Sequence, residues 1–208
     1  DDNVGVYTPL FAEMGRAAAA HPDELAFGLL AAGESTLCYD GQNFFDTDHP
    51  VYPNVDGTGT AATVSNLQAG TGPAWYLLDN SRALKPLIFQ ERTAPELQAM
   101  TQAQDEAVFM RDEYRYGIRY RCNAGFGFWQ LAYKSKATLD AANFNAAMAA
   151  MMATRADGGR PMGIKPTHLV VPPSLRADAL TLIKALMINN TSNPNYEAVE
   201  VIVSPWLQ

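Results

Sequence analysis

The C-terminal third of the chain is organised by one stretch, Thr167-His168-Leu169-Val170-Val171-Pro172-Pro173-Ser174. Residues 167–171 form an apolar, β-branched run that is typical of a buried strand, and the two prolines end it because proline cannot donate a backbone hydrogen bond. A helix can then be capped by Ser174 and carries Leu175, Leu182 and Leu186. Because residues 199–203 supply a further strand, we predict an α/β layer here.

The segments ahead of this stretch extend the same layer. Apolar residues at helical spacing, Phe144, Met148 and Met151, predict a helix that continues to Arg155. We expect this helix to be capped at Thr138 or Asp140 and to stop at Gly158-Gly159. Residues 75–78 and 87–90 have the composition of short strands.

The N-terminal part predicts a long, alanine-rich helix. From Tyr7 to Ala32 apolar residues recur at helical spacing, and Gly33 is a natural stop. Pro22 lacks the amide that would bond back to the carbonyl of Ala18, so we expect a kink or break there.

Residues 108–120 alternate charged with apolar or aromatic side chains, which predicts a half-buried strand. We expect residues 126–132 to continue the sheet, with Gly125 and Gly127 permitting a tight bend. Charges of both signs gather on this stretch, and opposed charges across an interface set register more than affinity. We therefore take as candidate subunit contacts Arg111, Asp112, Glu113 and Arg115; a plain solvated face is the alternative.

Residues 34–71 lose all periodicity and are rich in Asp, Asn, Gly and Pro, which favours a long irregular excursion. Such a loop needs anchors, and aromatic side chains can supply them: Tyr39, Phe44, Phe45 and Tyr52. The same loop contains the one plausible set of metal ligands, Asp40, Asp46, Asp48 and His49. Their spacing matches no EF-hand or zinc motif, so we expect no metal, cofactor or catalytic residue.

Composition excludes several classes of protein. A net charge of −7 opposes tight contact with nucleic acid, which depends on Lys and Arg neutralising phosphates. No window approaches the roughly 20 apolar residues of a bilayer-spanning helix. Only Cys38 and Cys122 occur, without CxxC spacing, which favours free thiols in a reducing compartment.

Several stretches, in one order along nearly the whole chain, resemble the Mu-like phage major head subunit family. The chain opens with a similar stretch over residues 2–16, Asp2-Asn3-Val4-Gly5-Val6-Tyr7-Thr8-Pro9-Leu10-Phe11 followed by Glu13-Met14-Gly15-Arg16. The long loop is similar through Cys38-Tyr39-Asp40-Gly41-Gln42-Asn43-Phe44-Phe45-Asp46 and again over residues 49–59. Further similar stretches are residues 76–79, 89–92, 125–130 and 165–172.

This resemblance implies an α+β, HK97-type capsid fold. It assigns residues 1–36 and 84–128 to a peripheral part with a long helix and elongated strands, and residues 37–83 and 129–208 to an axial part with a central sheet flanked by helices. Family members carry a further N-terminal segment, which would supply an N-terminal arm and an extended loop. We expect both to be missing here, and these 208 residues alone not to assemble.

The resemblance implies a structural subunit of an icosahedral phage head, not an enzyme. Its partners would be copies of itself in pentamers and hexamers, with scaffold, portal and head-maturation proteins, close to packaged DNA without gripping it. We expect assembly in the bacterial host cytoplasm and no membrane contact. Two loops are candidates for meeting around a capsomer axis: Arg155 to Gly163, which contains Arg160, and Asn189 to Tyr196.

Two other functions stay open from the sequence. A cellular nanocompartment shell would share the fold and enclose proteins instead of a genome. A metal-dependent hydrolase would use Asp46, Asp48 and His49.

Overall fold

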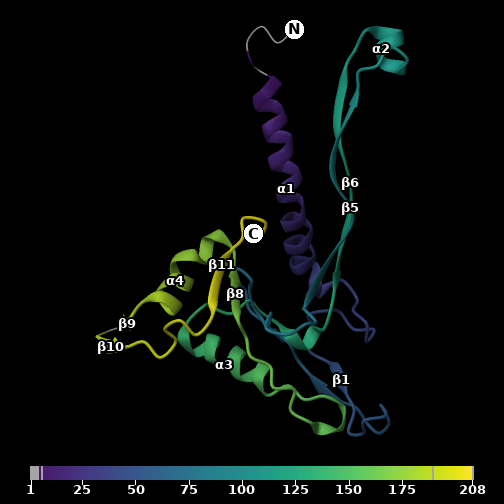
Figure 1. Ribbon diagram of the computed structural model, residues 1–208. Coiled ribbons are helices and arrows are strands. Elements are labelled where there is room, and N and C mark those ends of the chain that lie inside the picture. Colours follow the sequence, from purple (N-terminus) through teal and green to yellow (C-terminus); the bar gives the residue numbers. More distant parts are fainter. Residues whose placement is uncertain (1–4, 6, 189, 208) are drawn as a thin grey trace. The chain divides into compact units, whose positions relative to one another are not determined.

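The computed structural model describes residues 5, 7–188 and 190–207 and shows a mixed helix-and-sheet chain (Figure 1). The chain divides into two compact units. The first comprises Asp1–Ala26 and Phe89–Gly125, and the second comprises Phe27–Ile88 and Phe126–Gln208.

The long helix α1 (Tyr7–Ala31) runs through Pro22 without interruption, so the predicted break is wrong. Proline removes one backbone hydrogen bond, and the turns on either side hold the helix together. The predicted end is close, because a short 3-10 turn (Ala32–Glu34) follows directly. A Cβ at Gly33 would lie 2.5 Å from the Phe45 ring, so only glycine fits there.

The first unit joins the N-terminal part of α1 to a long two-stranded ribbon of β5 (Leu87–Met100) and β6 (Arg115–Phe126). Phe11 of α1 meets Tyr116 of β6 edge to face at 5.0 Å, and His21 meets Tyr120 at 5.9 Å. Among the described residues of this unit, Ala107 is the one buried hydrophobic side chain. The unit is therefore nearly without a core.

The tip of the ribbon corrects the predicted strand over residues 108–120. Residues Glu106–Arg111 form the helix α2 at the far end of the ribbon (Figure 1). A turn starts it, in which the Asp105 amide donates to the Gln102 carbonyl at 2.9 Å. Asp112, in the left-handed region with φ 55°, ends it, and β6 begins only at Arg115. The chain reverses here, and alternation alone did not reveal that reversal.

The predicted strand over residues 126–132 is also wrong for most of its length. β6 ends at Phe126, and the Gly127 amide donates to the Pro86 carbonyl at 2.8 Å. A 3-10 turn (Trp129–Leu131) then leads into β7 (Ala132–Ser135). The bend expected at the glycine pair is therefore real, but a new strand follows it.

The second unit is built on a five-stranded sheet in the order β11-β8-β4-β7-β3. Its strands are β3 (Leu67–Gln68), β4 (Trp75–Leu78), β7, β8 (His168–Val171) and β11 (Glu200–Val203). β4 runs antiparallel to both β7 and β8, while β11 is parallel to β8 and β3 is parallel to β7. The predicted strands at residues 75–78, 167–171 and 199–203 are confirmed to within one residue.

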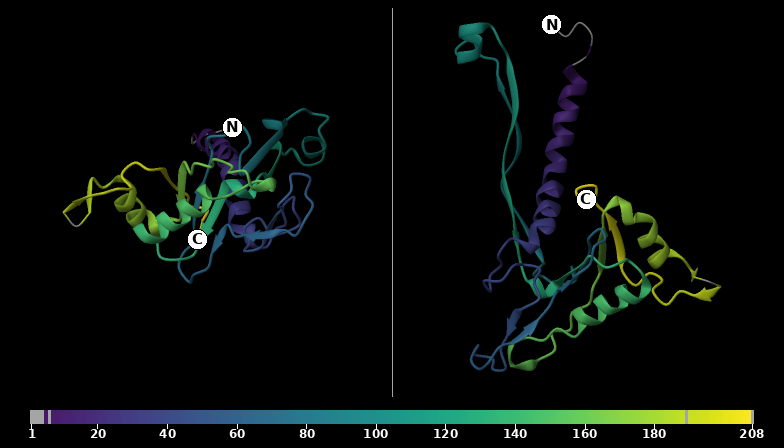
Figure 2. Two further views of the ribbon diagram at one scale, coloured as in Figure 1. Left: turned by 90° about the horizontal axis from the view of Figure 1, so that it is seen from below. Right: turned by 180° about the vertical axis from the view of Figure 1, so that it is seen from behind.

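Helices cover one face of this sheet (Figure 2). Trp75 and Leu77 of β4 point to the helix side, where they join α3 (Ala141–Met152) and α4 (Arg176–Lys184). The predicted Asp140 cap is confirmed, since its side chain accepts from the Asn143 amide at 2.8 Å. The helix ends at Met152, so Arg155 lies outside it. The predicted Ser174 cap is wrong, because residues Pro173–Leu175 form a 3-10 turn and α4 starts at Arg176.

The end of α1 and the long loop cover the opposite face of the sheet. Leu30, Phe44 and Phe45 pack there against Tyr76 and Leu78 of β4. The loop is mostly irregular, as predicted, with one small hairpin of β1 (His49–Val51) and β2 (Ala62–Val64). Of the expected aromatic anchors, Phe44 and Phe45 are buried whereas the Tyr39 side chain is 60% exposed. A last small hairpin, β9 (Met187–Ile188) with β10 (Thr191–Ser192), follows α4.

A buried lysine ties the end of α1 to the sheet. Lys134 of β7 is 4% exposed, and its Nζ lies 2.7 Å from Glu34 Oε1. Lys136 reaches the same oxygen at 2.8 Å. Burial alone would raise the pKa of Glu34, but hydrogen bonds and the charges of the two lysines outweigh burial and lower it.

Replacing Gly127 by alanine should destabilise the fold, because the added Cβ would lie 2.0 Å from the Lys85 carbonyl oxygen. We expect Gly127→Ala to lower the free energy of unfolding by about 1–3 kcal/mol. Gly125→Ala is the matched control, since its Cβ would meet nothing within 4 Å. Thermal unfolding followed by circular dichroism measures both; equal losses in the two variants would contradict this account of Gly127.

Glu34→Gln should lower stability at neutral pH and lose its effect in acid. The pKa of Glu34 is lowered in the folded chain, so its stabilising contribution is present above the ordinary pKa of 4.5 and is lost as the pH falls through the folded-state pKa. We expect a loss of about 1–2 kcal/mol at pH 7, after allowance for partial exposure. Denaturant titrations at several pH values test this, with Glu197→Gln, in a looser exposed pair with Lys184, as the control. A loss that is the same at every pH would count against the ion pair as its cause.

Candidate functional site

The ribbon tip gathers the charged residues that were predicted as subunit contacts. Arg111 is the last residue of α2, Asp112 is its cap, and both are exposed. The Arg115 guanidinium pairs with Glu113 at 3.2 Å, with the two side chains 55% and 51% exposed. An exposed pair of this kind adds little to the stability of one chain. These groups are therefore available to a partner.

The same tip also exposes apolar side chains that the sequence analysis missed. Phe109 is 79% exposed and Met110 is 69% exposed, whereas Ala107 on the same short helix is buried. Met110 and Arg111 help to line a small cavity of about 210 Å³ with Met100, Glu106, Ala107 and Arg115. The strand predicted over residues 108–120 included both Phe109 and Met110, which the structure places on α2. An apolar centre beside charged groups is the usual make-up of a protein interface.

The remaining candidate contact, Arg160, belongs to the second unit. It is exposed in a tight loop closed by an isolated bridge between Arg155 and Pro161. Asp157 Oδ1 accepts from the Tyr52 amide at 2.8 Å, which ties this loop to the segment after β1. The other expected contact loop begins at Asn189, which lies outside the described residues. Beside it, Leu186 and Met187 are 68% and 61% exposed.

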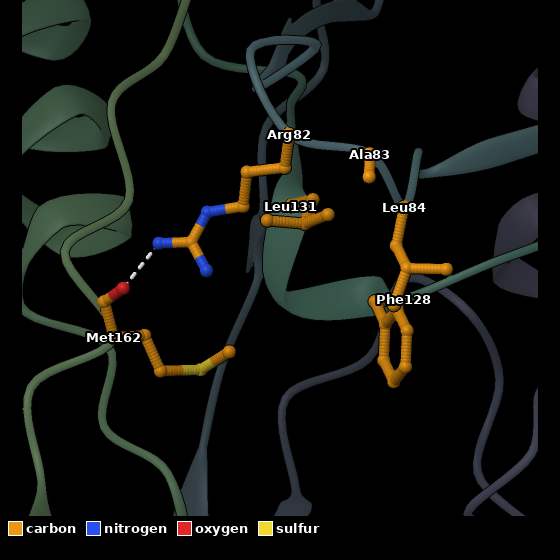
Figure 3. Close-up of a pocket in the computed structure, with 6 residues that line it drawn as sticks. All are labelled: Arg82, Ala83, Leu84, Phe128, Leu131 and Met162. Carbon is orange, nitrogen blue, oxygen red and sulfur yellow. Dashed lines mark hydrogen bonds between the residues drawn. The ribbon is translucent and has the colours of Figure 1, made fainter.

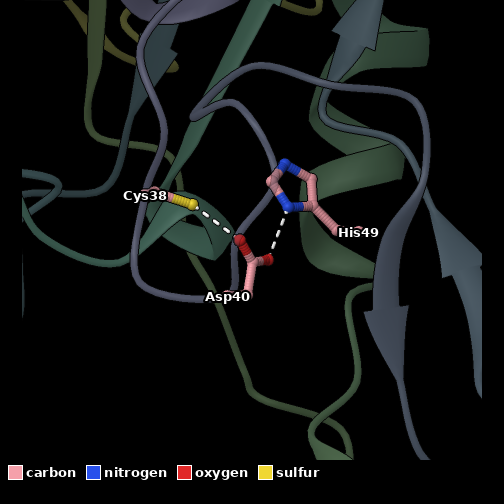
Figure 4. A group of neighbouring side chains, drawn as sticks. All are labelled: Cys38, Asp40 and His49. Carbon is pink, nitrogen blue, oxygen red and sulfur yellow. Dashed lines mark hydrogen bonds and ion pairs between the residues drawn. The ribbon is translucent and has the colours of Figure 1, made fainter.

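The acidic loop does not bring all four candidate metal ligands together. Asp46 and Asp48 lie outside the cluster that the structure forms, in which Cys38 joins Asp40 and His49 (Figure 4). One ligand atom from each of these three side chains lies within 4.8 Å of the others. Asp40 is central: its Oδ1 accepts from Cys38 Sγ at 2.9 Å, and its Oδ2 lies 2.8 Å from His49 Nδ1. The Cys38-x-Asp40-Gly41 turn was the missed signal.

The surroundings of this cluster are largely apolar. The His49 ring is fully buried and stacks on Trp129 at 3.9 Å, with 9° between the planes. Its Nε2 is buried without a hydrogen-bond partner among the described residues, a situation that costs about 1–3 kcal/mol. Burial and the neighbouring Asp40 carboxylate raise the pKa of the Cys38 thiol to about 12. Burial opposes the lowering of the Asp40 pKa, but hydrogen bonds from Cys38, His49 and Gln42 prevail.

An apolar cavity of about 300 Å³ also lies in the second unit (Figure 3). The Arg82 guanidinium donates to the Met162 carbonyl across it, and the other lining residues are Ala83, Leu84, Phe128 and Leu131. Arg82 is the one titratable side chain in this lining. The cavity therefore offers neither a nucleophile nor a base.

The sequence matches the family described as Mu-like prophage major head subunit gpT over residues 1–207. The chain belongs to this family. It is 54% identical to the Mu-like prophage FluMu major head subunit of Haemophilus influenzae, over 88% of this chain and 61% of that protein. It is 48% identical to the major capsid protein of Escherichia phage Mu, over 100% of this chain and 70% of that protein.

A solved structure gives the same result for the fold. A chain in the procapsid of bacteriophage JBD30 is 61% identical, with a TM-score of 0.87 over 100% of this chain and 70% of that one. The predicted α+β, HK97-type capsid fold is confirmed. The matched family and structures are head and capsid proteins, so the prediction of a structural protein and not an enzyme is confirmed, and nothing supports the hydrolase.

Within the part of the chain that the structure describes, no helix is long and apolar enough to cross a membrane.

The exposed apolar residues of α2 should contribute little to the stability of one Mu-like head subunit chain. We expect the double variant Phe109→Ser with Met110→Ser to change the free energy of unfolding by less than about 0.5 kcal/mol, because both side chains are mostly exposed. Ala107→Asp is the contrasting variant and should be destabilising, because it buries a charge. Thermal melts compare the variants; a large loss in the double serine variant would show that the tip packs within its own chain.

Proposed function

We propose that this chain forms part of the icosahedral head of a Mu-like phage or prophage by packing against copies of itself. The observation that carries the proposal is the family membership together with a unit that lacks a core of its own. A two-stranded ribbon is marginally stable alone, and Ala107 is the one buried hydrophobic among the described residues of the first unit. Contacts with neighbouring subunits can supply the missing burial.

The first unit acts as the peripheral part of the subunit and the second as the axial part. The peripheral assignment rests on the long helix and the elongated ribbon, and the axial assignment on a central sheet flanked by helices. The loops of residues 155–163, which contain Arg160, and 189–196 then meet their counterparts around a capsomer axis. Shell subunits repeat heterologous contacts of this kind, and closure yields pentamers and hexamers.

Contacts at the ribbon tip combine two physical effects. Phe109 and Met110 bury apolar surface against a neighbour, at about 25 cal/mol per Å². The charges at the tip disfavour incorrect registers between neighbouring subunits, because like charges brought together cost several kcal/mol. These charged residues are Arg111, Asp112, Glu113 and Arg115. Affinity thus comes from the apolar pair and geometry from the charges.

The packaged genome lies near the shell without being tightly bound by this subunit. The net charge of −7 supports this proposal, since phosphate contacts require clustered Lys and Arg. Scaffold, portal and head-maturation proteins complete the set of proposed partners, and assembly takes place in the host cytoplasm. The matched relatives are named as phage and prophage head proteins, which favours a genome container over a nanocompartment.

Charge reversal at the ribbon tip should impair assembly without unfolding the subunit. We expect Arg115→Glu, in the subunit expressed at its full natural length, to reduce the yield of closed shells at least about tenfold, because it places like charges in the contact. Arg176→Glu makes the same charge change on the exposed face of α4 and serves as the control. Negative-stain particle counts and circular dichroism are the readouts. A normal yield of shells from Arg115→Glu would remove the tip from the set of contacts.

A further inference from the structure

The cluster of Cys38, Asp40 and His49 has no part in the proposed subunit contacts. It offers a sulfur, an oxygen and a nitrogen from three side chains, all within 4.8 Å of one another (Figure 4). We propose that these three side chains form a binding site for a zinc-like divalent cation. The ion would tie the turn that begins at Cys38 to the first residue of β1.

The backbone holds the three side chains in place without the ion. The Cys38 amide donates to the Gln42 carbonyl at 2.8 Å, and the Gly41 amide donates to the Cys38 carbonyl at 3.2 Å. Gly41 has φ +86°, a conformation that glycine adopts without strain. His49 starts β1, where it pairs with Val64. A preformed loop of this kind lowers the ordering cost of binding a metal.

The donor set selects the type of ion. Thiolate and imidazole ligands suit zinc and related transition metals, whereas calcium and magnesium take oxygen ligands. Bonds of about 2.0–2.3 Å in a tetrahedral site place neighbouring ligand atoms about 3.5 Å apart. The two hydrogen-bonded pairs lie at 2.8 and 2.9 Å, so each would separate by well under 1 Å, while the Cys38 and His49 ligand atoms lie within 4.8 Å. Rotation of the Cys38 and Asp40 side chains can adjust these distances.

The burial of His49 fixes which of its two ring nitrogens faces the cluster. Its ring is fully buried against Trp129, yet Nε2 has no partner among the described residues. Nδ1 lies 2.8 Å from Asp40 Oδ2, whereas Nε2 points away from Asp40 (Figure 4), so a metal ion in the cluster would bind His49 through Nδ1. On binding, the Cys38 thiol proton would leave to solvent, and the His49 proton would reside on Nε2. Three protein ligands leave the fourth tetrahedral position to water.

Cobalt(II) is the probe for this site because its spectrum reports both thiolate ligation and coordination geometry. The purified chain, first stripped with a chelator and kept reduced, is titrated with Co²⁺ alone. We expect a thiolate-to-cobalt charge-transfer band and the visible bands of tetrahedral cobalt, saturating at one ion per chain and abolished by excess Zn²⁺. Zinc should also raise Tm by several degrees, because it binds only the folded chain.

Matched variants assign the ligands. Cys38→Ser should abolish the charge-transfer band, whereas Cys122→Ser should leave it unchanged. Asp40→Asn should weaken cobalt binding at least about tenfold, which is the size of loss expected when a group that supports a metal site is removed. Asp48→Asn should leave the affinity for cobalt unchanged. Circular dichroism must show each variant folded, and Cys38→Ala replaces Cys38→Ser where it does not. Absence of the charge-transfer band in the unchanged chain, or its survival without Cys38, overturns the proposal.

Discussion

The second unit depends on one strand that is buried on both faces. All four residues of β4, from Trp75 to Leu78, are buried, and the strand lies between β7 and β8 in the middle of the sheet. Because side chains alternate along a strand, Trp75 and Leu77 enter the core beneath the helices while Tyr76 and Leu78 enter the core beneath the long loop. A shift of one residue in register would exchange the two sets. The irregular loop of residues 35–74 can thus be well packed without regular structure, because Phe44 and Phe45 have a fixed apolar face to cover.

The two units of the chain differ in the source of their stability. The second unit buries aromatic and aliphatic side chains on both sides of its sheet and includes one buried lysine, paired with Glu34. The first unit pairs a helix with a ribbon whose strands are largely exposed. Few of its contacts exclude water, so its free energy of local unfolding is expected to be small. Contact with a neighbouring subunit would therefore stabilise the first unit far more than the second.

Sequence patterns predicted the elements whose cause is local. Residues 75–78 and 168–171 are short apolar runs bounded by turn residues, and Asp140 precedes a clear helical period, so each was found closely. The prediction of a strand over residues 108–120 was wrong because the chain reverses direction at α2. This reversal is a property of the tertiary structure and leaves no mark on the alternation of charged and apolar residues. The prediction of a helix break at Pro22 was also wrong, because the neighbouring turns support the helix around this residue. The grouping of Cys38 with His49 depends on a loop that folds back over eleven residues, and spacing alone does not reveal it.

The division of labour between the units follows from how a closed shell is built. Every subunit in a shell must hold its own shape while it adapts to pentameric and hexameric surroundings. A unit with two packed cores keeps its shape. An ion bound at the proposed site of Cys38, Asp40 and His49 would stiffen this unit further. A ribbon with almost no core can bend at low cost, and Phe109 and Met110 are exposed in the single chain. The proposed contact with a neighbour would bury both and make the first unit rigid only on assembly, so a free subunit would not bear the entropy cost of ordering it.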